Sequence, residues 1–400
     1  MRVMTLDEDG PGNPATIANT VGDLAAMATN AFEIHAVILI GASIATITLG
    51  VIVALLLLRA IFFSGPLRTP VTPPPTGIID MHCHTAGIGA GESGAWVSDA
   101  MRHSWKFGLY MRVFGSSKKE VCAKGDRVLM DIIARSIRDS IHVDGAVILA
   151  MDAPYSREGK LDRAAGEMFV PNRFVGETVK SCPELYFGAS VHPCRTDALE
   201  ELAWSKENDA VLMKWLPNIQ QIDPSDERHV PYYKKLVELD LPLLSHVGDE
   251  DSFSTTNNAL GDPHLLKLPL ELGVRVIAAH VASAGKSQGE DNVERLLKMM
   301  PEYPNLVADL STLTQFNRRR HLRKVLNDER LEGRLMYGTD YPLTNTPLVT
   351  PWQYFMNLKL RGLWQLAGTG NSWDRDVKLK AALGVPREVF TCSRDYLRLP

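Results

Sequence analysis

The chain has 400 residues, of which 45% are hydrophobic and 22% charged, with a formal net charge of −4 at pH 7. This length accommodates one α/β barrel of about 250 residues together with an additional segment. The slightly acidic balance gives no reason to expect a nucleic-acid partner, so we expect no nucleic-acid binding. The densest basic run is typical of a solvated helix face, and it comprises Arg318, Arg319, Arg320, Arg323 and Lys324.

An acidic segment and a long apolar run open the chain. Residues 1–34 carry five acidic residues against one arginine, and we expect a loosely ordered segment with some helix near residues 17–30. Residues 36–58 then form 23 consecutive uncharged positions, whereas about 20 apolar residues suffice to span a bilayer as a helix. We therefore predict a transmembrane helix over residues 35–63. A buried core helix would rarely be so long, and a signal peptide would follow a basic start, which is missing here.

Charges and cysteines bear on the orientation of this helix. Arg59 and Arg68 follow it, whereas mainly acidic residues precede it, so the positive-inside rule places the C-terminal domain in the cytoplasm. The five cysteines are odd in number and contain no CxxC pair, which also favours a reducing compartment. We expect a single-pass protein of the inner or plasma membrane.

One face of the apolar helix carries small residues. Ala42, Thr46, Gly50 and Ala54 recur every four positions, a spacing that allows close contact between helices. Homodimerisation through this face is therefore one hypothesis.

A proline-rich segment follows, over residues 64–77, with prolines at 66, 70, 73, 74 and 75. Such a density favours extended polyproline geometry, so we predict a semi-rigid linker. The folded domain is predicted over residues 78–400.

Short apolar runs alternate with amphipathic stretches throughout this domain, a pattern typical of βα units. Eight strands are predicted, over residues 77–84, 145–152, 185–193, 210–217, 241–248, 274–283, 305–312 and 334–342. Eight such units predict a closed (β/α)8 TIM barrel with a C-terminal helical extension.

The predicted strands end on polar residues, where the active sites of this fold lie. Five of the eleven histidines fall there, and the set comprises His82 and His84 on strand one, His192 on strand three, Lys214 on strand four, His246 on strand five, His280 on strand six and Asp340 on strand eight. His82 and His84 are two positions apart, so both project from the same face of their strand and can share one metal ion.

These residues carry a family resemblance. The run from Ile79 to His84, the later His246 and His280, and the Gly338-Thr339-Asp340-Tyr341-Pro342 ending resemble the amidohydrolase superfamily, in particular its amidohydrolase-2 branch of metal-dependent TIM-barrel hydrolases. The resemblance covers about residues 78–400.

The resemblance implies roles for the strand-end residues. His82 and His84 would hold a divalent metal, His246 and His280 would complete the ligand set and take part in catalysis, and Asp340 would contact the metal and act as general base. Zn²⁺ is the expected metal, since imidazole and carboxylate ligands suit it, although they also accept other ions.

Lys214 decides between one and two metals per chain. Members of the superfamily with two metals use a carboxylated lysine at the end of strand four as a bridging ligand, and Lys214 stands at the matching position. Unmodified lysine has only donors and cannot bridge cations. Many amidohydrolase-2 members resemble this chain, carry the lysine and work with one metal, so both alternatives stay open.

Four further residues follow strand ends and are expected to bind substrate: His192, Arg195, Trp215 and Tyr341. For His192 the alternative is a hydrogen-bonded packing residue.

The expected function is hydrolysis of a C–N or C–O bond in an amide, lactone or ester of a small molecule. Some relatives in the branch resemble carboxymuconate-semialdehyde decarboxylase, so non-oxidative decarboxylation is the alternative. A non-catalytic, membrane-tethered binding protein is a third hypothesis, which the complete set of ligands disfavours.

Overall fold

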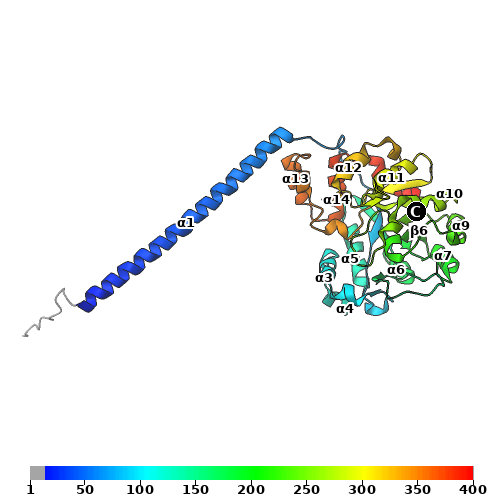
Figure 1. The fold of residues 1–400 in the computed structure, drawn as a ribbon, viewed down its shortest axis with the longest axis horizontal. Helices are drawn as coiled ribbons and strands as arrows, with labels where there is room; N and C mark the ends of the chain where they lie inside the picture. Colours follow the sequence, from blue (N-terminus) through cyan, green and yellow to red (C-terminus); the bar gives the residue numbers. More distant parts are fainter. Residues whose placement is uncertain (1–13, 400) are drawn as a thin grey trace, which may run out of the picture. The chain divides into compact units, whose positions relative to one another are not determined.

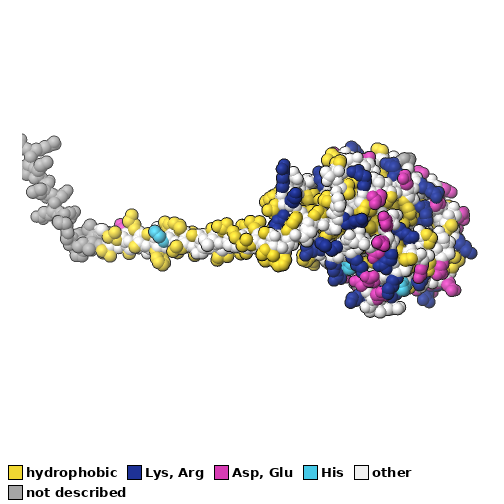
Figure 2. Space-filling view, turned by 90° about the horizontal axis from the view of Figure 1, so that it is seen from above, with side chains coloured by type: hydrophobic (Ala, Val, Ile, Leu, Met, Phe, Trp, Pro, Cys, Tyr) yellow, Lys and Arg dark blue, Asp and Glu magenta, His cyan; other side chains and the backbone are white. Residues whose placement is uncertain are grey.

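The computed structural model describes residues 14–399, and the chain divides into two units, one ending at Ser64 and one beginning at Gly65. The described part of the first unit is dominated by one helix, α1 (Pro14–Phe62). Figure 2 shows hydrophobic side chains along this helix. The part from Ala18 is long and apolar enough to cross a membrane, with a mean hydropathy of 2.5 over 18 residues, a test that a signal sequence also passes.

The N-terminal boundary of α1 differs from the expectation. Residues 14–34 belong to the helix throughout, whereas the sequence predicts a flexible segment over residues 1–34 with some helix only near residues 17–30. Six alanines between Pro14 and Ile34 favour helix, and the apolar run that follows extends the same helix, so that no new nucleation step is needed. Residues 1–13 lie outside the described part of the chain.

The second unit is a barrel of eight parallel strands surrounded by helices (Figure 1). In spatial order the strands are β1 (Ile78–His84), β3 (Val143–Leu149), β5 (Leu185–Ala189), β6 (Ala210–Trp215), β7 (Leu243–Ser245), β8 (Val276–Ala278), β11 (Leu306–Asp309) and β12 (Leu335–Met336). A parallel bridge between Cys83 and Tyr341 joins the last strand region to the first, so the barrel is nearly closed. The predicted fold class is confirmed.

Helices follow most strands. They are α2 (Asp99–His103), α3 (Trp105–Val113), α4 (Lys118–Lys124), α5 (Arg127–Arg138), α6 (Asn172–Val179), α7 (Ala198–Glu207), α8 (Pro217–Gln220), α9 (Val230–Glu238), α10 (Lys267–Glu271), α11 (Asn292–Met299), α12 (Arg319–Leu326), α13 (Leu360–Ala367), α14 (Ser372–Leu383), α15 (Arg387–Thr391) and α16 (Ser393–Tyr396). Two short antiparallel pairs lie outside the barrel, β2 (Trp96–Val97) with β4 (Met168–Phe169), and β9 (Lys286–Ser287) with β10 (Glu290–Asp291).

Strand alternation produces two apolar cores. Residues such as Met81, Val147 and Leu212 form one cluster, which the C-terminal residues Leu397 and Leu399 also join. The neighbouring positions, such as Ile148 and Met213, belong to the larger cluster between the strands and the helices. Successive residues of a strand therefore lie on opposite faces of the barrel wall, as strand geometry requires.

The proline-rich segment belongs to the barrel unit. Arg68 donates to the carbonyl of Leu326 at 2.8 Å, and the amide of Val71 donates to the carbonyl of Ala381 at 3.0 Å. The compact unit thus begins at Gly65, well before Ile78, where the sequence predicts its start. Extended proline-rich backbone leaves its amide and carbonyl groups unpaired internally, which makes them available to neighbouring helices.

Candidate metal centre

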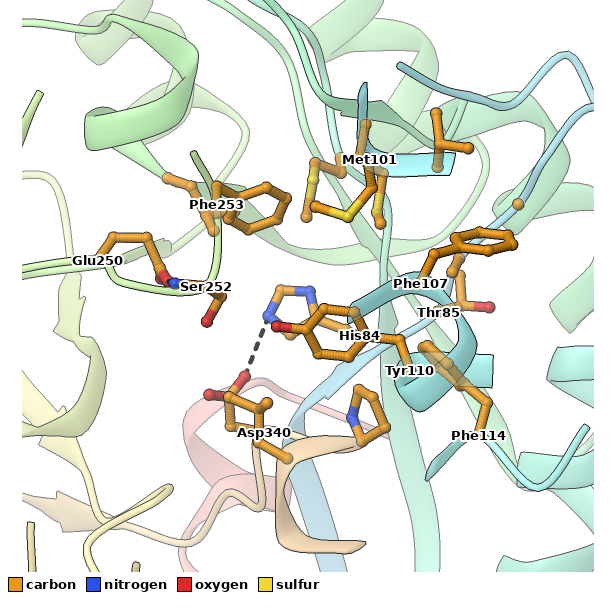
Figure 3. A pocket seen from close by; sticks show the side chains of 18 of the residues that line it. His84, Thr85, Met101, Phe107, Tyr110, Phe114, Glu250, Ser252, Phe253 and Asp340 are labelled. Carbon is orange, nitrogen blue, oxygen red and sulfur yellow. Dashed lines mark hydrogen bonds and ion pairs between the residues drawn. The ribbon is translucent and has the colours of Figure 1, made fainter. Parts of the chain in front are cut away.

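Three side chains converge at the C-terminal end of the barrel. The Nε2 atoms of His82 and His84, both on β1, lie 3.2 Å apart. Asp340 follows β12, and its Oδ1 lies 3.4 Å from Nε2 of His82 and 3.2 Å from Nε2 of His84. Figure 3 shows the contact between His84 and Asp340 as a dashed line. The three ligand atoms all lie within 4.8 Å of one another.

The donor set fits a divalent cation. Nδ1 of His82 lies 2.8 Å from Oδ2 of Asp309, so the proton of a neutral His82 resides on Nδ1 and leaves a lone pair on Nε2. That lone pair faces the carboxylate oxygen of Asp340, and two acceptors at this distance repel each other unless a cation or a proton lies between them. Two imidazoles and a carboxylate are common ligands of Zn²⁺ and related ions.

Asp309, the last residue of β11, holds this arrangement in place. Besides His82 it contacts Ser311, whose hydroxyl donates to Oδ1, and the backbone amide of His280, which donates to Oδ1 at 3.0 Å. Burial alone would raise the pKa of Asp309, but the neighbouring His82 and His280 hold it well below its usual range. A carboxylate that orients a ligating imidazole is typical of metal sites.

His280 and His246 border the triad without joining it. Nε2 of His280 lies 3.8 Å from Oδ2 of Asp340, and its Nδ1 lies 2.7 Å from Oγ of Ser311. His246 stands edge-on to His280, with ring centroids 5.3 Å apart, and its Nδ1 lies 3.6 Å from Glu250. Nε2 of His246 is buried and has no hydrogen-bond partner among the described residues. An orphaned buried nitrogen at this place is a further sign of a ligand site.

Burial keeps these imidazoles neutral. It lowers the pKa of His84 and of His246 to about 4, and that of His280 well below its usual range. Burial would raise the pKa of Asp340, but the imidazoles around it hold that pKa well below its usual range. Neutral imidazole and ionised carboxylate are the forms that bind metals.

Lys214 is the penultimate residue of β6 and is fully buried. Its Nζ lies 3.1 Å from Nε2 of His82. Burial lowers the pKa of the ammonium to about 8, so that a substantial fraction is neutral in mildly alkaline solution. The lysine thus stands beside the triad, where the sequence places it.

The backbone at the triad is locally strained. Asp340 has a φ of 57° and His280 a φ of 56°, a left-handed conformation that is uncommon for residues other than glycine. Gly338 lets the chain approach β1, since a Cβ there would meet Cβ of His82 at 2.8 Å. Asp80 fixes the segment before Asp340 by accepting hydrogen bonds from the amide of Thr339 at 2.9 Å and from its hydroxyl.

An apolar pocket opens above the triad. Its floor contains His84, Asp340, Lys214, His246 and His280, and its space amounts to about 860 Å³ including the part open to solvent. Figure 3 shows the apolar walls around the floor. The walls are formed mainly by Ile88, Val97, Met101, Phe107, Tyr110, Met111, Phe114, Met151, Met168, Leu216, Phe253 and Leu343.

The wall residues from α2, α3 and the loop after β7 were missed in the sequence. These wall residues belong to no catalytic motif. In α3 the buried residues are Phe107, Met111 and Val113, which read as ordinary core positions in the sequence. Glu250 offers the one readable signal, because it stands four positions after His246 in the same loop.

The four residues that the sequence predicts to bind substrate do not line this pocket. Both ring nitrogens of His192 are engaged, Nε2 by the carbonyl of Gln220 at 2.9 Å and Nδ1 by the amide of Cys194 at 3.1 Å. Of the two interpretations of His192, substrate binding and a hydrogen-bonded packing residue, the structure supports the second. Arg195 pairs with Asp197 at 2.8 Å and with Asp152 at 3.3 Å instead of reaching the pocket.

The predicted substrate contacts of Trp215 and Tyr341 are wrong for the same reason. Each follows a residue of the pocket floor by one position, Lys214 or Asp340 respectively, and so points to the other side of the barrel wall. Trp215 donates to the carbonyl of Val191 at 2.9 Å. Tyr341 stacks on Trp373, with ring centroids 4.7 Å apart.

Fold and site together define a TIM-barrel protein with a candidate divalent-metal site at the C-terminal ends of its strands. The sequence comparison agrees, because a family model described as Amidohydrolase matches residues 79–363. The chain belongs to this amidohydrolase family.

Three solved structures are similar to this chain at low identity, each with a TM-score below 0.5. An uncharacterized TIM-barrel protein from Bordetella bronchiseptica is 14% identical, with a TM-score of 0.47, over 77% of this chain and 99% of that one. 5-Carboxyvanillate decarboxylase from Sphingomonas paucimobilis is 11% identical, with a TM-score of 0.45, over 81% and 99%. Amidohydrolase 2 from Bifidobacterium longum subsp. infantis is 12% identical, with a TM-score of 0.42, over 81% and 99%. A search of curated proteins by sequence found no match.

Proposed function

We propose that the chain is a metal-dependent hydrolase that cleaves a C–N or C–O bond in a neutral, largely apolar amide, lactone or ester. One observation carries the proposal: His84 and Asp340, which form a candidate metal triad with His82, lie at the floor of a pocket whose walls are apolar. Pockets of this kind fix a small molecule by apolar contact and use few polar groups for chemistry.

The residues of the floor have distinct tasks in this proposal. His82, His84 and Asp340 would hold the cation, with His246 and His280 as additional ligands. When bound, a divalent cation acts as a Lewis acid and lowers the pKa of water towards 7. Asp340 is ionised, so it serves as general base by taking a proton from the attacking water and returning it to the leaving group.

We propose a single metal per chain, with Lys214 unmodified. The short contact of its Nζ with His82 brings it next to the reacting bond, where its ammonium can donate to a carbonyl oxygen of the substrate. A carboxylated Lys214 bridging two metals is the competing arrangement. Metal analysis after incubation with bicarbonate separates the two, because a second equivalent of metal would contradict the mononuclear site.

The pocket walls favour hydrolysis over decarboxylation. No arginine lines the described pocket, and Lys214 is the only lysine there. A substrate that must present a carboxylate to the enzyme usually meets an arginine, whose planar guanidinium binds it with two hydrogen bonds. A neutral ester, lactone or amide needs no such partner.

We further propose that α1 anchors the protein in an inner or plasma membrane, with the barrel in the cytoplasm. The apolar length of α1 supports the anchor, and Arg59 at its C-terminal end supports the orientation.

Turnover assays of the full-length protein in detergent test the reaction. The panel pairs neutral aryl and alkyl esters, lactones and amides with aromatic carboxylic acids of matched size, and it records acid release and carbon dioxide separately. We expect acid release from neutral substrates that Asp340→Asn abolishes. Carbon dioxide release from the acids, without turnover of neutral substrates, would identify a decarboxylase instead.

A further inference from the structure

Four exposed hydrophobic side chains gather on the barrel, and none of them lines the pocket. Phe316 is 61% exposed, Leu348 47%, Trp352 37% and Trp364 68%. The rings of Trp352 and Trp364 meet edge to face, with centroids 4.9 Å apart. The amide of Phe316 donates to the carbonyl of Leu348 at 3.0 Å. Two tryptophans so exposed are unusual on a soluble surface.

Arg319 joins the two pairs into one surface. Its guanidinium lies 5.0 Å from the ring centroid of Phe316, and it also donates to the carbonyl of Gln353, next to Trp352. We call the area formed by Phe316, Arg319, Leu348, Trp352 and Trp364 the basic aromatic surface.

The two segments that form this surface carry only positive charges. Residues 310–327 and 341–373 contain no Asp or Glu, although the whole chain has a net charge of −4. They contain seven basic residues, namely Arg318, Arg319, Arg320, Arg323, Lys324, Lys359 and Arg361. Within the described part of the chain, Arg320, Arg323, Lys359 and Arg361 have no ion pair with a carboxylate. Their charges are thus left for an external anion.

The chain that leads to α1 starts at this place. The carbonyl of Gly65 accepts a hydrogen bond from the side-chain amide of Asn357 at 2.9 Å, and Asn357 lies between Trp352 and Trp364 in the sequence. Helix α1 ends at Phe62, only three residues before Gly65. Three extended residues reach at most about 10 Å. A bilayer that holds α1 therefore lies within a short chain length of the basic aromatic surface, whichever direction the helix takes.

We propose that the basic aromatic surface docks on the anionic lipid headgroups of the bilayer that holds α1. The inference rests on the proposed membrane anchor and is independent of the reaction. Tryptophan favours the headgroup region, because its ring is amphipathic, and basic residues are attracted to the anionic lipids of the cytoplasmic leaflet. The surface thus adds a second argument for a cytoplasmic barrel.

Docking bears on access to the pocket. Pro342 and Leu343, which line the pocket, lie at the start of the 341–373 segment that carries Trp352 and Trp364. A barrel docked through this segment holds that wall of the pocket near the bilayer, where an apolar substrate concentrates.

Tryptophan quenching in nanodiscs tests the proposal on the full chain. Discs holding one copy are made with brominated phosphatidylcholine and phosphatidylglycerol, whose bromine quenches tryptophans that touch the lipid. Wild type is compared with Trp352→Phe/Trp364→Phe and with Trp105→Phe, a control whose tryptophan is 76% exposed on α3. We expect the double variant to lose most of the lipid quenching and the control to keep it. Equal quenching in wild type and double variant would overturn the proposal.

Charge reversal tests the lipid class. Arg320→Glu/Lys359→Glu/Arg361→Glu is compared with Lys118→Glu/Lys119→Glu/Lys206→Glu, which reverses three exposed charges elsewhere on the barrel. We expect the first variant to lower the ratio of docked to undocked barrel by about fivefold per residue in anionic discs. Quenching that is the same in discs of phosphatidylcholine alone would contradict docking on anionic lipid.

Two further outcomes are distinguishable. If the basic aromatic surface becomes buried only in discs that hold two copies of the chain, the surface is an interface between chains. That outcome would overturn the proposal. Extraction of the protein from membranes by alkaline carbonate would refute the anchor on which the proposal rests, whatever the result of the activity assay.

Discussion

Two buried polar clusters at the strand ends of this barrel differ in how their hydrogen bonds are satisfied. Around His192 both ring nitrogens are paired, with the carbonyl of Gln220 and the amide of Cys194. Around the triad, Nε2 of His246 is buried without a partner among the described residues, and Nε2 of His82 and of His84 faces Oδ1 of Asp340 at 3.4 and 3.2 Å. Both clusters carry histidine at a strand end, so position alone does not separate them.

A structural histidine and a candidate ligand differ in whether both ring nitrogens have hydrogen-bond partners. A paired imidazole stabilises the fold and has no atom left for a ligand, whereas an unpaired buried nitrogen costs about 1–3 kcal/mol unless something binds it. The comparison predicts that variants of the two clusters affect different properties.

The largest effect is expected for His84→Ala, which removes one ligand of the triad. Turnover of the best substrate should fall about 10³-fold or more, because the cation supplies several kcal/mol of transition-state stabilisation. Steady-state kinetics measures this, with His103→Ala as the control, since His103 lies on the exposed side of α2. Activity within threefold of wild type would exclude His84 from the site.

A smaller effect is expected for Asp309→Asn. The neutral side-chain amide of the variant would attract the Nδ1 proton of His82 less strongly than the carboxylate of Asp309 does. His82 would then be a weaker ligand, and the metal affinity should fall about 10–100-fold. Competition with a chromogenic chelator measures the affinity, and Asp144→Asn on the exposed face of β3 is the control. An unchanged affinity would mean that Asp309 does not support a metal-binding imidazole.

His192→Leu is expected to act on stability instead. It leaves the carbonyl of Gln220 and the amide of Cys194 unpaired, which should lower the free energy of unfolding by about 1–3 kcal/mol. Metal content should equal that of wild type. Thermal unfolding and elemental analysis of the same preparation provide both values, and a loss of metal without a loss of stability would reverse the assignment of the two clusters.

The smallest effect is a pH dependence from Asp152, next to His192. Burial raises its pKa to about 6, above the value of about 3.9 in an unfolded chain. The folded state therefore takes up a proton more readily, so ionised Asp152 destabilises the fold above pH 6, and this cost disappears as the pH falls from 6 to 4. The stability of wild type relative to Asp152→Asn should rise by about 1 kcal/mol between pH 7 and pH 5. A difference that stays constant over this range would contradict the raised pKa.

Much of the fold could be predicted because its signals are local. Eight apolar runs of strand length and their polar endings are visible in the sequence, and the structure brings His82, His84 and Asp340 together as those endings suggest. The contacts of the proline-rich segment could not be read, because they depend on packing against distant residues such as Leu326. The predicted start of α1 is too late, because the prediction weighs the acidic residues of the segment above its six alanines, a local signal that favours helix.

The substrate side was harder to predict for two reasons. Trp215 and Tyr341 directly follow Lys214 and Asp340, so strand alternation alone could have excluded them from the pocket. For His192 no sequence rule suffices, because one of its two partners, the carbonyl of Gln220, comes from α8, 28 residues later. The apolar walls from α3 lack any motif and emerge only from the folded chain.

The most direct test of the account is the metal content of the full-length protein, purified in detergent and measured by mass spectrometry of the elements. We expect about one equivalent of a divalent transition metal in wild type and in His192→Leu, and almost none in His84→Ala. A wild-type protein that is active without any bound metal, or a His84→Ala variant that keeps its full equivalent, would contradict this expectation.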